Sequence, residues 1–410
     1  MFRLLSHLCF YGSLKMSAPQ ARKQCWSLLR VTHFCQAAPD GLMYCIPALL
    51  YLPSESTFLA FAEKRTSFRD EHAEFLVMRR GQKDGMSVQK NDTVFLFFIC
   101  VHRTMNPCPI YDRKNDTVFL FFICVQTHVT EGHQIQTGRN VARLCYVSSQ
   151  DGGHTWSQVT DLTDQVIGDD LRNWATFAVG QATDSSGDKV VSSTEPHCFI
   201  LYSDDGGQNW ACGQLLVNLR TTECQVAELI HQDDSKILYC SVRSPHRKRA
   251  EAFTNLGQDQ FDVSSLCKGL SEPPHGCEGS ISDWSLMSLK STKSWLIFLH
   301  RTNAHKRTDL GIYLMTSALE KGCWTKPWVL YKGPSSYLDL AMCEQVELLM
   351  FGCLFEGGVS SACEEIVFQL FRDIDLLRNV REHCSHPETH LELRGYCFPP
   401  RNRSGTGFSP

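Results

Sequence analysis

Hydrophobic and polar positions along the chain form short apolar runs of the kind that build β-strands. Gly, Asp and Ser residues separate many of these runs and supply turn signals. Regularly spaced short strands with such turns predict an all-β barrel, sandwich or propeller. The clearest strand candidates are VARLCYVSSQDGG (141–153), HCFILYSDDGG (197–207), SKILYCSVRS (235–244), SWLIFLH (294–300), DLGIYLM (309–315) and LLMFGCLFEGG (348–358).

Helical periodicity is scarce. The best helical candidate is residues 364–377 (EEIVFQLFRDIDLL), although its EEIVFQLF half fits a strand equally well. Residues 1–40 show no sustained pattern, and residues 376–410 end in a tail rich in Pro, Arg, Ser and Gly. We therefore expect one β-rich core over residues 41–375, between an irregular N-terminal extension and a C-terminal tail.

A strand–turn–strand pattern near the start of this core gathers charged residues. The apolar run 43–52 leads into a polar turn, and a second apolar run over 58–62 follows. Glu63 and Arg65 end the second run, and Asp70 comes five residues after Arg65. Two paired strands of this layout are expected to deliver the three charges to one rim of the fold.

A short repeat discriminates among the β architectures. Residues 149–156 (SQDGGHTW) and 203–210 (SDDGGQNW) share the pattern S-x-D-x-G-x-[TN]-W, and each follows an apolar run. In such a box Asp and Ser bond backbone groups of a hairpin turn, Gly supplies a positive φ, and Trp tucks back under the hairpin. Residues 254–261 (TNLGQDQF) resemble a worn third copy. Repeated hairpins of this kind favour propeller blades.

A second repeat has a different origin. The segment KNDTVFLFFICV occurs identically at 90–101 and at 114–125. Diverged blades keep a pattern rather than a sequence, so an identical copy indicates a recent duplication or an error in the assembled sequence. Only the second copy has a turn-like lead, YDRKND, so the first is expected to form an extra apolar strand prone to lie at a sheet edge.

Charge and cysteine content narrow the class of protein. The net charge of −4 offers no polybasic surface, so nucleic acid is not an expected partner. The chain has 20 cysteines, and no CxxC pair or Cys/His group has zinc-ligand spacing, so no metal site is predicted. Several cysteines lie within apolar runs, which favours buried reduced thiols over a disulfide framework. We then expect the sequons at Asn91, Asn115 and Asn402 to be chance matches and not glycan sites.

No apolar run reaches the ~18–20 residues of a membrane-spanning helix. The N-terminal segment MFRLLSHLCFYGSLK lacks a convincing signal-peptide cleavage site. Any membrane association is therefore expected to be peripheral, or to depend on acylation of a cysteine.

The boxes and the pattern around residues 43–72 resemble the sialidase (neuraminidase) family, and within it the vertebrate non-lysosomal, ganglioside-preferring group. The resemblance recurs in order over residues 45–375. It implies a six-bladed β-propeller of four-stranded antiparallel blades with its active site on the central axis. It also implies an exo-α-sialidase acting with retention and without a metal or organic cofactor. The supporting motifs are HRTMNPCPIYD (102–112), WATFAVG (174–180), ECQVAE (223–228), EPPHGCEGS (272–280), DLGIYL (309–314) and MFGCLFE (350–356).

The resemblance also implies a set of site residues. The substrate is a 2-keto acid sugar with a carboxylate on its anomeric carbon, and Arg binds a carboxylate through two parallel hydrogen bonds. Three arginines are expected; Arg243 and Arg307 match two of them, and Cys45 occupies the position of the third. A neutral thiol cannot replace a guanidinium.

The charge of the substrate also favours one type of nucleophile. A carboxylate nucleophile would be repelled by the sugar carboxylate, so a phenol activated by a base is preferred. The resemblance assigns Tyr337 as nucleophile, Glu223 as its base and Asp70 as acid/base. The implied supporting residues are Glu63 and Glu356 as braces for the arginines, Arg65 near the carboxylate or ring, and Glu131 on the N-acetyl side.

Four departures from the family pattern leave a second reading open. Cys45 removes one carboxylate clamp, and loss of one partner of a buried charge pair costs roughly 2–5 kcal/mol. The tyrosine-containing segment expected after Val191 is missing, Leu338 stands in place of Ser, and Glu278 in place of Gln. The alternative is a catalytically impaired propeller that binds sialylated glycans or membrane partners. For either function the resemblance implies sialylated glycolipids and oligosaccharides as partners and a peripheral plasma-membrane location, with a cytosolic or endosomal/lysosomal pool.

Overall fold

The chain is described here by a computed structural model. The described residues are 30–35, 41–85, 87–97, 101–169, 174–179, 181–184, 195–213, 215–216, 218–230, 236–255, 261, 265–285, 294–316, 324–345 and 348–383. The segment around Val191, where the tyrosines are expected, and most of the worn third box lie outside these residues.

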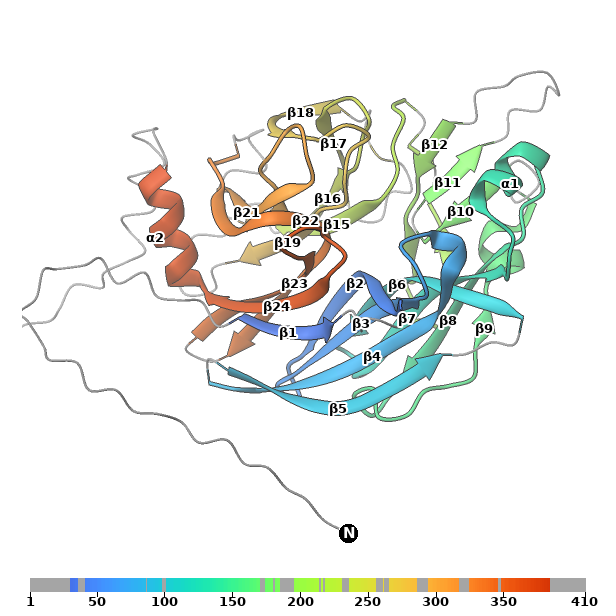
Figure 1. The fold of residues 1–410 in the computed structure, drawn as a ribbon, viewed down its shortest axis with the longest axis horizontal. Coiled ribbons are helices and arrows are strands. Elements are labelled where there is room, and N and C mark those ends of the chain that lie inside the picture. The colour runs from blue at the N-terminus through green and yellow to red at the C-terminus, as the bar shows by residue number, and fades with distance from the viewer. Residues whose placement is uncertain are drawn as a thin grey trace, which may run out of the picture.

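The fold is a β-propeller, which confirms the predicted fold class (Figure 1). Its described strands fall into six groups of antiparallel neighbours; the third combines two separate sheets, and the sixth is completed by a strand from the start of the chain. The first is β2 (Met43–Leu52), β3 (Thr57–Arg65), β4 (Ala73–Asp84) and β5 (Ser87–Phe97). The second is β6 (His102–Asp112), β7 (Thr117–Gln126), β8 (Ala142–Ser149) and β9 (Thr160–Asp161). The third is β10 (Trp174–Ala178), β11 (Gln181–Asp184) and β12 (Glu195–Cys198), followed by the ribbon β13 (Leu201–Tyr202) and β14 (Ala211–Cys212).

Of the remaining three groups, the fifth and sixth share one long strand. The fourth is β15 (Cys224–Ile230), β16 (Lys236–Val242), β17 (Lys248–Asn255) and β18 (Ser265–Ser271). The fifth is β19 (Ser280–Ser285), β20 (Ser294–Arg301), β21 (Thr308–Met315) and the first part of β22 (Trp328–Gln345). The sixth is the rest of β22, β23 (Leu348–Gly357), β24 (Glu365–Arg372) and β1 (Arg30–Cys35). The partner of β22 changes from β21 at Pro334 to β23 at Ser335.

The expected irregularity of residues 1–40 is wrong for residues 30–35. These residues form β1, which pairs antiparallel with β24 from Arg30↔Gln369 to Cys35↔Glu365. Figure 1 shows the blue β1 lying against the red β24. Phe34 of β1 is buried in an apolar cluster. Without β1, the sixth group would end in an unpaired edge over this apolar layer. One N-terminal strand thus completes the last blade.

The candidate helix 364–377 divides into a strand and a helix. Residues Glu365–Arg372 form β24, and α2 (Asp373–His383) follows it, past the expected core boundary at residue 375. Leu376, Leu377 and Val380 of α2 are buried in an apolar cluster with the fifth and sixth groups. The other short helices are η1 (Asp70–His72), α1 (Glu131–Thr137) and η2 (Thr163–Ile167).

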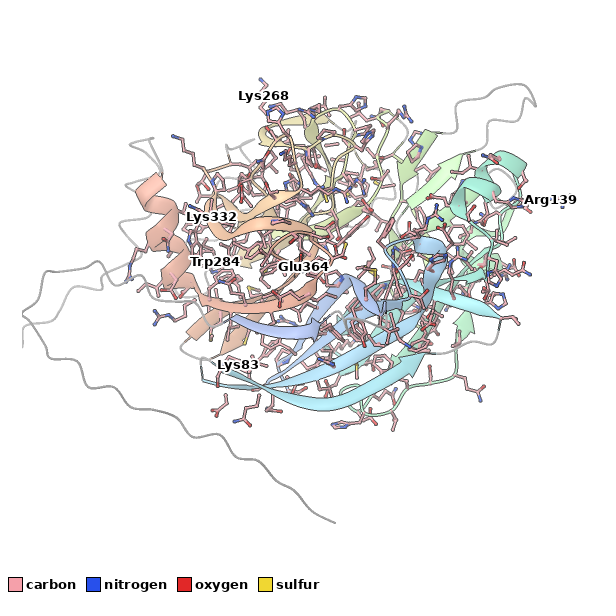
Figure 2. All side chains as sticks on the ribbon, in the orientation of Figure 1. Lys83, Arg139, Lys268, Trp284, Lys332 and Glu364 are labelled. Atoms are coloured by element: carbon pink, nitrogen blue, oxygen red, sulfur yellow. The ribbon has the colours of Figure 1, made fainter. Side chains whose placement is uncertain are left out.

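Apolar side chains fill the spaces between neighbouring blades. One cluster joins the first and second groups, another joins the sixth and first, and a third joins the fourth and fifth. In Figure 2, Trp284 lies inside this packing, whereas Lys268 and Arg139 project outward at the periphery. The core is therefore a ring of interfaces between sheets, which holds the inner strand ends in fixed positions.

The two identical segments occupy different places. The first copy lies largely in β5, which in the described part of the chain pairs with β4 and forms the predicted sheet edge; it is the fourth strand of the first group and not an extra strand. The second copy forms β7, which lies between β6 and β8.

The two S-x-D boxes form turns of the predicted kind. In the first, Ser149 Oγ accepts a hydrogen bond from Gly153 N at 2.8 Å, and Asp151 accepts from Thr155 N at 2.8 Å. In the second, Ser203 and Asp205 make the corresponding contacts, and Trp210 is buried against Phe121.

Candidate active site

A cavity of about 600 Å³ opens among the inner strand ends of several blades. Of the predicted site residues, Arg65, Asp70, Glu131, Glu223, Arg243 and Tyr337 line it. The other four predicted residues lie just outside the lining. Glu63 bonds Arg65 and Glu356 bonds Tyr337, both of which line the cavity, whereas Arg307 bonds Ser336, the neighbour of Tyr337, and Cys45 is paired with Glu63. The predicted residues from five different blades therefore converge on one place.

Tyr337, Glu223 and Arg243 form the centre of the site. Glu223 immediately precedes β15 and Arg243 immediately follows β16, so the pairing of these strands sets the two residues side by side. Tyr337 lies on β22, just past the point where this strand changes its partner. The Tyr337 hydroxyl donates to Glu223 Oε1 at 2.9 Å, and Arg243 Nη1 donates to Glu223 Oε2 at 2.6 Å.

The electrostatics of this group keep the phenol neutral in the resting state. Burial and the charge of Glu223 raise the pKa of Tyr337 well above its ordinary range. A hydroxyl of this kind becomes a nucleophile only if a base removes its proton during attack. Glu223 is the hydrogen-bonded acceptor and is placed to be that base.

Arg65 connects two carboxylates at the end of the first hairpin. Its Nε donates to Glu63 Oε2 at 2.7 Å, and its Nη1 donates to Asp70 Oδ1 at 2.6 Å. Glu63 is fully buried and also accepts from Asn106 N at 2.7 Å, whereas the Asp70 side chain is 65% exposed. The hairpin thus delivers the predicted charges to one rim, with Asp70 open to the cavity.

Glu356 does not brace an arginine, contrary to expectation. Its Oε1 accepts from Ile46 N at 2.8 Å, and its Oε2 accepts from Tyr337 N at 3.1 Å. Cys45, at the position where an arginine is expected, is buried, and the hydrogen bonds of Glu356 come from backbone N–H groups. Burial raises the pKa of Glu356 to about 7.

Arg307 lies next to Tyr337 on the side of Arg243. Its Nη1 donates to Ser336 Oγ at 3.4 Å, and its Nη2 donates to Gly276 O at 3.3 Å. These are long, uncharged contacts, so the guanidinium keeps donors for an incoming anion.

Glu131 opens α1 at the rim of the cavity. Thr130 caps this helix by accepting from His133 N at 3.0 Å. The preceding loop is fixed by Arg103, a buried residue that donates to Gln126 O and Val129 O.

Two supporting residues were not predicted. Arg103 lies in the HRTMNPCPIYD motif, which indicated only the family, and Asp339 lies in none of the motifs that indicated it. Asp339 is a buried carboxylate two residues after Tyr337. It accepts from Leu49 N at 2.8 Å and Ser280 Oγ at 2.8 Å, so it ties the strand of Tyr337 to the first and fifth blades.

The two other departures have a structural setting. Leu338 is fully buried, and its N–H donates to Glu278 Oε2 at 3.4 Å. Burial and the charges of Glu223 and Asp339 raise the pKa of Glu278 well above its ordinary value. A neutral carboxyl group offers the same carbonyl acceptor as the amide that the family pattern expects.

Among the described residues the cysteines form no disulfide, and no helix is both long and apolar enough to cross a membrane. Among the same described residues, one group of potential metal ligands occurs, and it consists of Cys198, Cys224 and Cys240. It lies outside the cavity lining, so no reaction step is derived through it.

Comparisons with known proteins agree with this geometry. A family model described as a BNR repeat-like domain matches residues 56–350. Sialidase-3 of Bos taurus is 42% identical over 413 residues, which cover 88% of this chain and 96% of that protein. Sialidase-3 of Homo sapiens is 42% identical over 407 residues, with 86% and 95% coverage. Among solved structures, Hadza microbial sialidase Hz136 shares the fold with a TM-score of 0.65 at 21% identity, over 82% of this chain and 66% of that one.

Proposed function

Because the chain belongs to the sialidase family of glycoside hydrolases, we propose that it is an exo-α-sialidase that releases terminal sialic acid from gangliosides and other sialoglycoconjugates. The observation that carries the proposal is the 2.9 Å hydrogen bond from the Tyr337 hydroxyl to Glu223. It pairs a neutral nucleophile with a base beside a cation, the arrangement that an anionic anomeric centre requires.

In the first step Tyr337 Oη bonds to the anomeric carbon while Glu223 takes the phenolic proton. Asp70 protonates the departing glycosidic oxygen as its bond to the sugar breaks. Arg243 and Arg307 hold the sugar carboxylate. In the second step the oxygen of a water molecule bonds to the anomeric carbon as the bond from that carbon to Tyr337 Oη breaks. Asp70 removes a proton from the water, and Glu223 returns the phenolic proton to Tyr337. Two displacements at one carbon retain its configuration.

A second candidate function rests on Cys45. A buried thiol stands at the position where the third carboxylate clamp is expected, and Glu356 accepts hydrogen bonds from backbone N–H groups. The chain would then bind sialylated glycans with little turnover. In this case the fold and the cavity would be the same as in the enzyme, and only the acceleration of hydrolysis would be lost.

One set of variants separates the two functions. Hydrolysis of a fluorogenic sialoside and of a ganglioside is measured at mildly acidic pH for the wild type, Tyr337→Phe and Cys45→Arg. We expect Tyr337→Phe to lower kcat at least about 10²-fold, because the nucleophile is lost. Tyr146→Phe is the matched control, since Tyr146 lies outside the cavity lining and its variant should keep full activity.

Cys45→Arg tests the missing clamp. If the enzyme reading holds, restoring a guanidinium should lower KM for both substrates. If the wild type and Cys45→Arg are both inactive while both still bind sialyl-lactose, the binding function replaces the enzyme. Turnover that survives Tyr337→Phe would instead remove Tyr337 from its proposed role.

For location we propose peripheral attachment to the plasma membrane, with a cytosolic or endosomal/lysosomal pool. The ganglioside substrate, which is fixed in a membrane, motivates this. Fractionation of expressing cells tests it: peripheral attachment predicts release from membranes by alkaline carbonate, and attachment by acylation predicts release by hydroxylamine.

A further inference from the structure

Three cysteine sulfurs converge in the core behind the active site. The Sγ atoms of Cys198, Cys224 and Cys240 all lie within 4.8 Å of one another. The residues are far apart in the sequence and have no motif spacing, which is why no metal site was predicted from the sequence. Only the fold brings them together.

Strand geometry explains the convergence. Cys224 is the first residue of β15, and Cys240 on β16 faces Val226, which lies on the same face of β15 as Cys224. Cys224 and Cys240 are therefore diagonal neighbours on one face of the fourth blade. Cys198 ends β12 of the third blade and meets them from the opposite side of the interface.

The surroundings of the three sulfurs are apolar. Cys198 and Cys240 are fully buried, and Leu216, Val242 and Ala252 pack in the same cluster. The Cys224 thiol contacts the Phe199 carbonyl at 3.8 Å. Buried thiols elsewhere in the chain also pair, as Cys124 does with Cys145, so the feature that distinguishes this cluster is that three sulfurs meet at one point.

We propose that Cys198, Cys224 and Cys240 form a three-coordinate site for a monovalent copper ion. Thiolate ligands select soft cations such as Cu(I) and Zn²⁺. Structural Zn²⁺ takes four ligands, and the group of ligands found among the described residues has three. A planar three-sulfur site with metal–sulfur bonds of about 2.3 Å has sulfurs about 4.0 Å apart, so the thiols need to close by at most about 0.8 Å.

The binding step is a ligand exchange without electron transfer. Three S–H bonds are replaced by three Cu–S bonds, and three protons pass to solvent. The ion arrives as Cu(I) and stays Cu(I). One of its ligands, Cys224, directly follows Glu223 in the sequence. Because successive residues of an extended chain point to opposite faces, the ion would lie on the face opposite to the Glu223 side chain, which contacts Tyr337.

The test uses the full chain, purified under reductant and without oxygen, titrated with Cu(I) against a chromogenic Cu(I) chelator. We expect one copper per chain, with X-ray absorption showing three sulfurs at about 2.3 Å. Cys240→Ser should lose this copper, and Cys145→Ser should keep it, because Cys145 is equally buried but lies in the second blade.

Each other outcome overturns the proposal. Equal copper binding by the wild type and Cys240→Ser would place the ion elsewhere, and fewer than three sulfurs in the wild-type spectrum would remove the three-coordinate site. Binding of Zn²⁺ in preference to Cu(I) would refute the choice of ion. If Cys240→Ser does not fold, the wild-type sulfur count decides, since it needs no variant.

Discussion

Glu272 is a carboxylate buried between the side chains of Arg249 and His300 in the fourth and fifth blades. It bonds Arg249 at 2.9 Å and lies 3.2 Å from His300, with the three side chains almost fully buried. Despite this burial, the charges of His300 and Arg249 lower the pKa of Glu272 to about 2. The carboxylate therefore stays ionised at neutral pH. Its contribution to stability is fully present above the ordinary pKa of 4.5 and is lost as the pH falls from there through about 2.

Glu272→Gln should destabilise the protein strongly. The substitution leaves the Arg249 charge buried without its counter-ion, which costs about 3–5 kcal/mol. The free energy of unfolding in urea measures this cost. Glu228→Gln is the control, because Glu228 pairs with Lys236 at the surface and such pairs contribute only about 0–1 kcal/mol. Equal effects of the two variants would contradict the prediction.

Glu356 gives the opposite pH dependence. Its pKa of about 7 lies above the ordinary 4.5, so the folded state prefers the protonated carboxyl group. The resulting stabilisation is fully present below pH 4.5 and is lost as the pH rises through about 7. The difference corresponds to at most about 3 kcal/mol.

Glu356→Gln should remove this pH dependence. The amide resembles the protonated carboxyl group and does not ionise, so stability should fall less for the variant than for the wild type between pH 5 and pH 8. Urea unfolding at the two pH values measures the difference. Parallel pH profiles for the two proteins would show that Glu356 does not titrate in this range.

At the scale of single residues, the site was predictable from the sequence because the family resemblance implied which residues form it. Tyr337, Glu223 and Arg243 meet as the resemblance implies: Glu223 precedes β15, Arg243 follows β16, and Tyr337 lies within β22. The partners of Glu356 were not predictable, since they are backbone N–H groups brought near by packing between the first and sixth blades. The cysteine cluster was missed for the same reason.

At the scale of elements, β5 and β7 compare one sequence in two environments. The copy in β5 has β4 as its neighbour, and the copy in β7 lies between two strands. Amides of β7 should therefore exchange with deuterium more slowly than the identical amides of β5, by at least about tenfold, or ~1.4 kcal/mol of opening free energy. Mass spectrometry of fragments with distinct flanking residues measures both. Equal rates would show that the edge is covered.

Most strands were predictable as elements. The runs at 141–153, 235–244 and 294–300 contain β8, β16 and β20, since local alternation and turn chemistry act within a few residues. The strand β1 was missed, because RVTHFC is too short to show periodicity and its identity as a strand depends on β24 at the other end of the chain.

At the scale of the whole molecule, the ring closes through β1. Phe34 anchors this strand: it is 1% exposed and its ring lies 5.0 Å from that of Tyr44 in the first blade. Phe34→Ala should therefore cost about 3–5 kcal/mol. Phe68→Ala is the control, because Phe68 is 73% exposed and surface substitutions stay within about 0.5 kcal/mol. Urea unfolding measures both, and a small effect of Phe34→Ala would mean that β1 does not hold the ring.

The pairing of β1 with β24 also sets an order of events during synthesis. Arg30 must wait for Gln369, its partner in the sheet, to be translated. At about 5–20 residues per second the ribosome takes roughly 17–70 s to cover that distance. Throughout that time the nascent chain contains completed blades, but the ring of blades is not closed. The strand β1 lacks its partner and can pair with any other exposed strand. The ring is thus completed after translation of nearly the whole chain, and truncated products would retain an open seam for quality control to recognise.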